Sequence, residues 1–376
     1  MNIHLVTDEF SLGGGIEHIY QVAKGLTEIK FRIFALPGNA VKKFQHLENV
    51  EIHDRGYHPS YVMEKKTDLV HFHHLRPFFS FFRKYMGRDT YNVPIIFTAH
   101  GLHVHKYEFY NSIRGKINYF LRSHLEKRLL SKADRIIAVS REDKVFLEGK
   151  YHLKNVTYLT NGIDFSALNA EDVLSKNKSD LRGKLDLPGD DFLFVTVARF
   201  HFQKGYDILI RAISLVKDAI KKHNGRFIFV GEGSEFEKMK HLSQNLSVDD
   251  CIIFLGARTD VYDILKAGDV SLLPSRWEGL PIILLETGLL KIPVIASDTY
   301  GSREIIKEKN GILFKNLDSE ALAAVIQDVL EKKYDLDSYS ENLYKEIHKN
   351  YNLEKMLTGL RDIYSSFQKE ELKGEK

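Results

Sequence analysis

The sequence predicts an α/β protein with two parallel, helix-covered sheets, and three observations lead to this fold class. Short segments rich in β-branched and aromatic residues alternate with longer helical patterns through both halves of the chain. Glycine or polar residues follow the ends of several of these segments, as in loops that connect strands to helices. The length of 376 residues suggests two domains rather than one. Alternation of this kind is typical of parallel sheets with helices on their faces.

The composition fits a globular protein and excludes other classes. Hydrophobic residues make up 43% of the chain, which is enough for full cores. The single cysteine, Cys251, rules out an intrachain disulfide and suggests a reducing compartment. No apolar run approaches the roughly 20 residues that span a bilayer, and the charged residues after Met1 do not fit a signal peptide. We therefore expect a cytoplasmic protein, either soluble or peripheral on the inner face of the cell membrane.

Charge is distributed unevenly along the chain. Residues 1–164 contain 24 Lys and Arg against 17 Asp and Glu, whereas the remainder contains 30 against 34. The first part also holds 13 of the 17 histidines. A basic half predicts an anionic partner, either a phosphorylated acceptor or an acidic membrane surface. Solvated charge that is scattered unevenly explains the same asymmetry equally well.

The first half is predicted to contain a series of short strands. They cover residues 2–7, 31–35, 50–53, 68–73, 93–99, 134–140 and 156–160. The glycines at positions 13–15 follow the first strand and precede the helical pattern of Ile19, Val22 and Leu26. Such a loop can bring backbone N–H groups close to an anion, although a tight turn without a ligand has the same sequence. The loop lacks the G-x-G-x-x-G pattern, so it is not a dinucleotide site.

Histidines follow two of the predicted strands. His71, His73 and His74 lie at the end of the strand over 68–73, but no cysteine or carboxylate completes a metal-ligand set nearby, so we expect no metal there. His100 follows the strand over 93–99. Ligands of open α/β sheets bind outside the carboxyl ends of the strands, so His100 is predicted to contact one.

Two stretches of the first half mix cations with apolar residues. Phenylalanines and cations share residues 76–88, as in an interfacial helix that lies on an anionic membrane. A helix with one buried face and cations that reach the solvent explains this pattern equally well. Residues 106–132 are predicted to be largely helical, and together with Arg135 they carry eight cations. Both stretches predict attachment to an anionic membrane surface.

A change of character separates the two halves. Polar residues with Gly183, Pro188 and Gly189 dominate residues 165–191, which are predicted to be a linker with a short helix. Further strands are predicted over 192–198, 227–230, 252–255, 270–273 and 293–296. An amphipathic helix is predicted over residues 353–367, before a frayed and charged tail.

Charged residues follow the first strand of the second half. Arg199 and Lys204 precede a helix that begins near Tyr206, and two cations beside a helix N-terminus suit a diphosphate. Ordinary surface charge is the alternative. Gly231 and Gly233 form a second glycine turn after the next strand, but without a third glycine they support a nicotinamide site only weakly.

Two carboxylates frame the turn that follows the strand over 270–273. Glu278 precedes a predicted helix over 282–290, and Glu286 lies within the apolar run of that helix. A carboxylate in apolar surroundings needs a partner. The protein can supply one through a salt bridge or a capped backbone amide. The alternative partner is the hydroxyl groups of a ligand. For Glu278 alone, the charge at a helix N-terminus is a sufficient explanation.

Together these two residues resemble the E-x7-E signature of the retaining GT-B glycosyltransferases of family 4. Other motifs follow the order and spacing of this family from one end of the chain to the other. They are residues 13–15 with Glu17, His100-Gly101, residues 161–164, Arg199 with Lys204-Gly205, residues 231–233, and residues 293–298. Two positions depart from the family pattern: Pro281, which has no N–H for a donor-sugar contact, and Arg303, where proline is common.

The resemblance implies a GT-B fold, in which two Rossmann-like domains face a cleft. Residues 1–170 would bind the acceptor, residues 185–350 would bind the nucleotide-sugar, and residues 351–376 would form a helix and tail that return to the first domain. The resemblance also implies a reaction that retains the anomeric configuration and needs no metal or other cofactor. Asp335 and Asp337 match a metal-binding D-x-D, but their polar surroundings argue against that role.

The resemblance also assigns roles to single residues. Arg199 and Lys204 would hold the donor diphosphate, and Glu286 would hold the ribose hydroxyls. Glu278 would hold hydroxyls of the transferred sugar, and His100 would lie close to that sugar. The remaining donor-binding positions are Gly14, Gly15, Gly231, Gly279, Leu280 and Ile282. The residues expected to be catalytic are Glu278, His100, Arg199 and Lys204.

The predicted function is transfer of a sugar from a nucleotide-sugar, expected to be a UDP-sugar, to a saccharide or lipid-linked acceptor in the synthesis of a cell-surface polysaccharide, lipopolysaccharide or glycolipid. Arg199 and Lys204 would stabilise the leaving diphosphate during a front-face attack, whereas double displacement with Glu278 as nucleophile stays open. Alternatives on the same fold are a UDP-sugar 2-epimerase, a glucan synthase and a catalytically silent nucleotide-sugar-binding subunit. Nucleic acid is not an expected partner.

Overall fold

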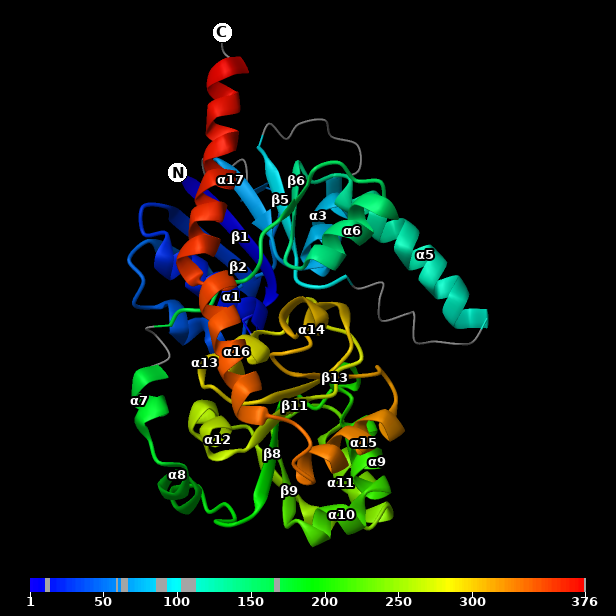
Figure 1. Ribbon diagram of the computed structural model, residues 1–376. Coiled ribbons are helices and arrows are strands. Elements are labelled where there is room, and N and C mark those ends of the chain that lie inside the picture. Colours follow the sequence, from blue (N-terminus) through cyan, green and yellow to red (C-terminus); the bar gives the residue numbers. More distant parts are fainter. Residues whose placement is uncertain are drawn as a thin grey trace. The chain divides into compact units, whose positions relative to one another are not determined.

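The computed structural model describes residues 1–10, 14–58, 60–61, 67–85, 93–102, 113–165 and 170–374. The chain forms two compact units (Figure 1). Unit 1 consists of residues Met1–Gly162 and Leu353–Lys376, and unit 2 consists of residues Ile163–Asn352. Each unit has its own parallel sheet and its own hydrophobic clusters. The predicted fold class is therefore confirmed.

Unit 1 is built on a seven-stranded sheet in the order β3-β2-β1-β4-β5-β6-β7. Its strands are β1 (Asn2–Glu9), β2 (Lys30–Leu36), β3 (Val50–His53), β4 (Leu69–Phe72), β5 (Ile95–Ala99), β6 (Arg135–Ala138) and β7 (Val156–Tyr158). Every neighbouring pair is parallel. The order runs outward from β1 to β3 on one side and from β4 to β7 on the other. The point between β1 and β4 is therefore the topological switch point, where α/β sheets bind ligands.

Helices cover this sheet because each carries an apolar face. They are α1 (Gly14–Gly25), the 3-10 helix η1 (Asn39–Phe44), α3 (Leu75–Tyr85), α5 (Ile113–Leu130), α6 (Arg141–Gly149) and α17 (Leu353–Gly374). The C-terminal helix α17 packs on unit 1, where Leu357, Leu360 and Tyr364 join the core cluster of α1 and β1. A Cβ atom at Gly25 of α1 would lie 2.2 Å from Leu357, so glycine allows the two helices to approach closely.

The structure decides between the two interpretations of residues 76–88. Phe78 and Phe81 of α3 are fully buried and pack against Phe72 at the end of β4. Phe78 and Phe81 of α3 therefore belong to the core of unit 1, while Arg76, Phe79 and Arg83 are exposed. The alternative of a helix with one buried face holds for α3, and residues 86–88 lie outside the described part of the chain.

Unit 2 is built on a six-stranded parallel sheet in the order β10-β9-β8-β11-β12-β13. Its strands are β8 (Phe192–Val197), β9 (Gly225–Val230), β10 (Ile252–Gly256), β11 (Val270–Leu273), β12 (Val294–Ser297) and β13 (Ile312–Phe314). The three-residue strand β13 was not predicted, because it is too short to show an alternating pattern. The switch point of this sheet lies between β8 and β11.

The helices of unit 2 cover both faces of this sheet. They are α7 (Ala170–Ser175), α8 (Lys178–Lys184), η2 (Phe202–Lys204), α9 (Tyr206–Leu215), α10 (Lys217–Lys222), α11 (Phe236–Asn245), η3 (Asp249–Cys251), α12 (Val261–Ala267), α13 (Ile282–Leu289), α14 (Tyr300–Ile305), α15 (Ser319–Leu330) and α16 (Leu336–Asn350). The aromatic core between sheet and helices includes Phe194, Phe227 and Tyr206.

The segment over 165–191, predicted to be a linker with one short helix, lies within unit 2 and forms α7 and α8 there. Leu181 and Leu187 are buried beside β8 and α12. Arg182 is buried as well, and it donates to the carbonyl oxygens of Ala267 and Asp191 at 2.9 Å and to the Asp269 carboxylate at 2.7 Å. These long-range contacts anchor a segment whose polar composition suggested a free linker.

Among the described residues, no helix has both the length and the hydrophobicity needed to cross a membrane. Asp335, part of the discounted D-x-D, caps the N-terminus of α16 by accepting the Ser338 N–H at 3.1 Å. That contact gives Asp335 a structural role at the start of α16.

Candidate active site

Two loops meet at the switch point of unit 2. The loop after β8 carries Arg199 and Lys204, and the loop after β11 carries Ser275 and Glu278. Because β8 and β11 are hydrogen-bonded neighbours, residues more than 70 positions apart in the sequence reach the same edge of the sheet. The predicted donor residues of the two loops are therefore brought together by the strand order.

Lys204 and Glu278 form the centre of this site. The Lys204 Nζ lies 2.5 Å from Glu278 Oε1, and the Ser275 hydroxyl donates to the same oxygen at 2.6 Å. Both charged side chains are largely withdrawn from water, with 19% of Lys204 and 7% of Glu278 exposed. A pair held in this way is well ordered, because breaking it would leave a buried charge without a partner.

Two glycines allow backbone segments to approach closely at these loops. Gly205, the N-cap of α9, has a φ of +67°, and a Cβ atom at this position would lie 2.0 Å from the carbonyl oxygen of Pro274. Gly301, after β12, likewise approaches the carbonyl oxygen of Gly279, at 2.1 Å from an added Cβ. Glycine is needed at both positions because a side chain would push backbone against backbone. The glycines after β8 and β12 thus set the path of the Glu278 loop.

Arg276 fixes the position of the same loop through side-chain and backbone contacts. Its guanidinium group makes a two-pronged ion pair with Asp207 of α9, at 2.9 and 2.7 Å, and lies 3.9 Å from the centroid of the Phe202 ring. The Arg276 N–H donates to the carbonyl oxygen of Gln203 at 2.7 Å, and the Arg276 carbonyl accepts from Asn316 at 2.8 Å. Arg276 therefore positions the loop and is not a ligand candidate. This role is not visible in the sequence, because Asp207 lies 69 residues away from Arg276.

The remaining predicted donor residues lie in the same unit. Glu286 is half-buried in α13, where the Tyr262 hydroxyl donates to its Oε1 at 2.9 Å. Arg199 is exposed beyond β8 and makes no side-chain ion pair with any described residue. The other positions are Gly231 beyond β9, Gly279 and Leu280 before α13, and Ile282 at its first turn. Arg303, the departure from the family pattern, forms an exposed ion pair with Asp298 at 2.6 Å.

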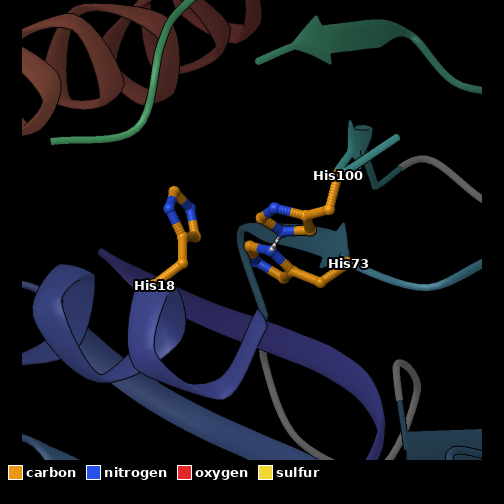
Figure 2. Close-up of side chains that lie close together, drawn as sticks. All are labelled: His18, His73 and His100. Atoms are coloured by element: carbon orange, nitrogen blue, oxygen red, sulfur yellow. Dashed lines mark hydrogen bonds between the residues drawn. The ribbon is translucent and has the colours of Figure 1, made fainter. Parts of the chain in front are cut away.

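Unit 1 presents a second cluster at its own switch point (Figure 2). Gly14 and Gly15 begin α1 after β1, His73 and His74 follow β4, and His100 follows β5. A Cβ atom at Gly15 would lie 3.1 Å from the His74 ring, so the glycine leaves room for that side chain. Gly13 lies outside the described residues.

Three histidines converge in this cluster. His73 Nδ1 lies 3.1 Å from His100 Nε2, and the ring of His18, from α1, lies with its centroid 4.9 Å from that of His100. One ring nitrogen from each of the three lies within 4.8 Å of the others. His18 was not among the predicted site residues, although its position one turn before Val22 places it on the buried face of α1.

His71, His73 and His74 have different hydrogen-bond partners in the structure, although the ring centroids of His71 and His73 lie 4.2 Å apart. Both nitrogens of His71 are occupied, one by the Tyr364 hydroxyl at 2.8 Å and the other by Thr98 at 2.7 Å. His74 pairs with Thr7 at 2.7 Å. The group formed by His18, His73 and His100 has the donor type that zinc accepts, but the same ring nitrogens can equally exchange hydrogen bonds with sugar hydroxyls.

Burial keeps this cluster uncharged at neutral pH. It lowers the pKa of His18 from 6.5 to about 4, against a smaller raising effect from Asn161. The pKa values of His71, His73 and His100 are also held well below the usual range, first by burial and then by the other histidines. Neutral rings can accept as well as donate hydrogen bonds, which suits contacts with hydroxyl groups.

These lowered pKa values predict acid instability of unit 1. In the unfolded chain the histidines take up protons as the pH falls below 6.5, while folded His18 stays neutral down to about pH 4. The free energy of unfolding should therefore fall between pH 6.5 and pH 4, by up to about 3 kcal/mol for His18 alone, and should not change through this group above pH 6.5. Melting curves across this range test the prediction. In the variant His18→Asn, the free energy of unfolding should depend less steeply on pH over this range. An identical pH dependence in the variant and the parent protein would contradict the prediction.

Comparisons with known proteins match both units. The family model described as "Glycosyl transferases group 1" matches residues 177–347, and the model described as "Glycosyltransferase Family 4" matches residues 12–167. The "Putative glycosyltransferase EpsD" of Bacillus subtilis is 30% identical over 70% of this chain and 68% of its own length. An Escherichia coli protein named "UDP-Gal:alpha-D-GlcNAc-diphosphoundecaprenol alpha-1,3-galactosyltransferase" is 26% identical, over 81% of this chain and 76% of its own.

Solved structures agree on the fold. The crystal structure of Anabaena Alr3699/HepE in complex with UDP-glucose superimposes with a TM-score of 0.80 at 18% identity, covering 97% of this chain and 100% of that one. Similarity at this level of identity shows a shared fold, and function has to be argued from the site.

Proposed function

Because the chain belongs to the GT-B glycosyltransferases of family 4, we propose that it transfers a sugar from a UDP-sugar, with retention of configuration, to a saccharide or lipid-linked acceptor. The observation that carries this proposal is the buried pair of Lys204 and Glu278 at the switch point of unit 2, with exposed Arg199 in the same loop as Lys204. These three side chains supply two cations for a diphosphate and a carboxylate for hydroxyl groups, all at one edge of one sheet.

The donor would be held by charge and by hydroxyl contacts. Arg199 and Lys204 would bind the diphosphate near the N-terminus of α9, whose free N–H groups also favour an anion. Glu286 would accept hydrogen bonds from the ribose hydroxyls, and Glu278 from those of the sugar. The carboxylates suit this task because a charged acceptor makes stronger hydrogen bonds than a neutral one.

Transfer breaks the bond between the anomeric carbon and the diphosphate oxygen, and the bonding electron pair leaves with the diphosphate. Arg199 and Lys204 would stabilise the charge that develops there. In a front-face attack, the acceptor oxygen bonds to the same face of the sugar and its proton passes to the leaving phosphate oxygen. His100 of unit 1, neutral at pH 7, would hydrogen-bond a hydroxyl of the transferred sugar.

The geometry of Glu278 favours this route over double displacement. Oε1 of Glu278 accepts hydrogen bonds from both Lys204 and Ser275, and these bonds draw electron density from the carboxylate and lower its nucleophilicity. Charge pairing with a cation at 2.5 Å makes the carboxylate less nucleophilic. We therefore assign Glu278 the binding of sugar hydroxyls.

The acceptor class is proposed from the relatives. One relative is named as acting on a diphosphoundecaprenol-linked sugar, and another, from Bacillus subtilis, is named as a "Putative teichuronic acid biosynthesis glycosyltransferase TuaC". We propose that this chain likewise extends a saccharide of the cell envelope, carried on a lipid diphosphate. The excess of cations in residues 1–164 suits an anionic acceptor of this kind.

Thermal stabilisation by nucleotides tests the donor assignment. A ligand that binds only the folded protein must raise the melting temperature, so UDP and its sugar conjugates should do so, whereas GDP, ADP and NAD should not. Glu286→Ala should weaken UDP binding about 10- to 100-fold, because it removes charged hydrogen bonds to the ribose. The matched control is Tyr262→Phe, which removes one internal hydrogen bond of Glu286 and keeps the carboxylate. Equal loss in both variants would contradict the role of Glu286.

Product analysis tests the reaction. The purified protein is incubated with the stabilising UDP-sugar in EDTA, with and without a lipid-diphosphate saccharide acceptor, because we propose transfer without a metal. A product that appears only with acceptor, with retained configuration, supports the proposal. A changed sugar without acceptor would indicate a 2-epimerase, and binding without turnover a silent subunit. Activity that appears only after Zn²⁺ is added would instead assign a metal to His18, His73 and His100.

A further inference from the structure

Three histidine side chains of unit 1 come from three separate elements and converge (Figure 2). His18 belongs to α1, His73 follows β4 and His100 follows β5. Because β4 pairs with both β1 and β5, the helix after β1 and the loops after β4 and β5 reach the same edge of the sheet. The strand order therefore brings together histidines that lie far apart in the sequence.

The distances between these three rings suit a shared metal ion. In a tetrahedral zinc site each Zn–N bond is about 2.0–2.1 Å long, so two ligand nitrogens lie about 3.3–3.4 Å apart. His73 Nδ1 already lies 3.1 Å from His100 Nε2. One nitrogen from each of the three rings lies within 4.8 Å of the others. A shift of the His18 ring by about 1.5 Å, which side-chain rotation can supply, would complete the ligand spacing.

Hydrogen bonding distinguishes these histidines from their neighbours. His71 and His74 are paired with hydroxyl groups of other residues. His18 and His73 are 6% and 2% exposed, yet both nitrogens of His18 and Nε2 of His73 lack a hydrogen bond of normal geometry to any described residue. Asn161 interacts with the His18 ring, and a carbonyl-type oxygen is a usual outer partner of a metal-bound histidine. Buried nitrogens without partners are uncommon, and a metal ion would satisfy them.

The donor atoms indicate which ion fits this group. Imidazole nitrogen suits Zn²⁺ and the neighbouring transition metals, whereas Mg²⁺ and Ca²⁺ prefer oxygen ligands. Within the described part of the chain, the group consists of three histidines and includes no carboxylate or cysteine. Three protein ligands leave the fourth position of a tetrahedral ion open, as in zinc sites that small molecules can reach. His100 is partly exposed, in agreement with an open position.

We propose that His18, His73 and His100 form a Zn²⁺ site in unit 1, with one ring nitrogen of each as a ligand. The bound ion inhibits sugar transfer and is not a cofactor. It takes up one nitrogen of His100 and holds the ring against His18 and His73, so this ring cannot turn toward a hydroxyl of the transferred sugar. The zinc site rests on unit 1 alone, whereas the inhibition rests on the proposed function.

Zinc binding to the full chain tests the site. Competition with a zinc-sensitive dye, without nucleotide or acceptor, should show one equivalent of Zn²⁺ bound per chain. His18→Asn, His73→Asn and His100→Asn should each weaken the affinity at least about 100-fold, because losing a ligand costs more than the roughly 10- to 100-fold effect of losing an outer partner.

X-ray absorption at the zinc edge tests the ligands in the parent protein. The spectrum should show about three imidazole nitrogens at about 2.0–2.1 Å from the ion. This measurement needs no substitution, so it decides the question even where a variant of a buried histidine fails to fold.

A matched control comes from unit 2. His241 is exposed on α11, so His241→Asn removes an imidazole outside the cluster and should leave the zinc affinity unchanged. Added Zn²⁺ should raise the melting temperature of the parent protein and of His241→Asn, but not that of the three cluster variants. Circular dichroism in EDTA shows which variants keep the fold.

Transfer assays with the parent protein test the inhibition. The rate of sugar transfer should fall as the free Zn²⁺ concentration rises, and excess EDTA should restore it. The free Zn²⁺ concentration that halves the rate should match the Kd from the dye competition.

Three outcomes would overturn the proposal. The first is zinc binding that is no tighter in the parent protein than in the three cluster variants. The second is a zinc-edge spectrum with sulfur or oxygen ligands in place of the three nitrogens. The third is transfer that stays equal or rises when the site is filled, which would remove the inhibitory role. Zinc bound through the three histidines by a protein that transfers no sugar in EDTA would support the site and contradict the proposed function, so the two failures are distinguishable.

Discussion

Replacing either member of the buried pair, by Lys204→Ala or Glu278→Gln, is expected to lower kcat of sugar transfer by about 100- to 1,000-fold, the range found when one preorganised charge-stabilising group is removed. Lys204→Ala removes a cation that we propose binds the diphosphate, and it leaves the Glu278 carboxylate, which is 7% exposed, without this cation. Glu278→Gln keeps the shape of the side chain and removes the charge that orders Lys204. The measurement is kcat with saturating donor and acceptor.

The double variant should be little worse than either single variant. The two charged atoms lie 2.5 Å apart, so each single change already disrupts the other residue, and the effects are not additive. Lys333→Ala is the matched control, because Lys333 forms an exposed ion pair with Asp328 in the same unit, and kcat should stay unchanged. If Glu278→Gln and Lys204→Ala both transferred sugar at the parent rate, the active-site assignment would be wrong.

Gly205→Ala should destabilise unit 2 by about 3 kcal/mol or more. The added Cβ would lie 2.0 Å from the Pro274 carbonyl oxygen, and both groups belong to the backbone, so neither can turn away as a side chain would. The positive φ of +67° alone costs a non-glycine residue about 1–2 kcal/mol. Urea unfolding can be followed by the fluorescence of Trp277, the single tryptophan, which lies in this loop.

Gly256→Ala separates the cost of a positive φ from the cost of the close backbone contact. Gly256 has nearly the same φ, +66°, but an added Cβ would meet nothing within 4 Å. This variant should therefore show only the backbone cost of about 1–2 kcal/mol, and it should keep UDP binding, whereas Gly205→Ala should lose it. Equal destabilisation of the two variants would show that the loops after β8 and β11 do not depend on the close contact at Pro274.

Much of the fold follows from local patterns. Twelve of the strands were predicted close to their observed positions, because alternating apolar segments and the glycines after them depend on neighbouring residues. β13 was missed because three residues show no period. The segment over 165–191 was misinterpreted as a linker, because its anchors are contacts of Arg182 with residues 267 and 269.

Residues of the candidate sites were also predicted in part from local patterns. The order of strand, loop and helix places Lys204, Glu278 and His100 at the carboxyl ends of strands, and that order can be counted along the sequence. The sequence does not show which loops become neighbours, because strand order within a sheet is set by long-range packing. His18 and Arg276 entered their clusters only through such packing.

The sequence by itself determined the two parallel sheets, the acidic and basic residues at their loop ends, and the family to which the chain belongs. Only the tertiary structure decided that Lys204 pairs with Glu278, that His18 joins His73 and His100, and that Phe78 and Phe81 of α3 belong to the core. The physical reason is that periodicity identifies an apolar face, whereas burial depends on which element packs against that face. Pairing across a sheet likewise depends on the strand order, which joins loops that lie far apart in the chain.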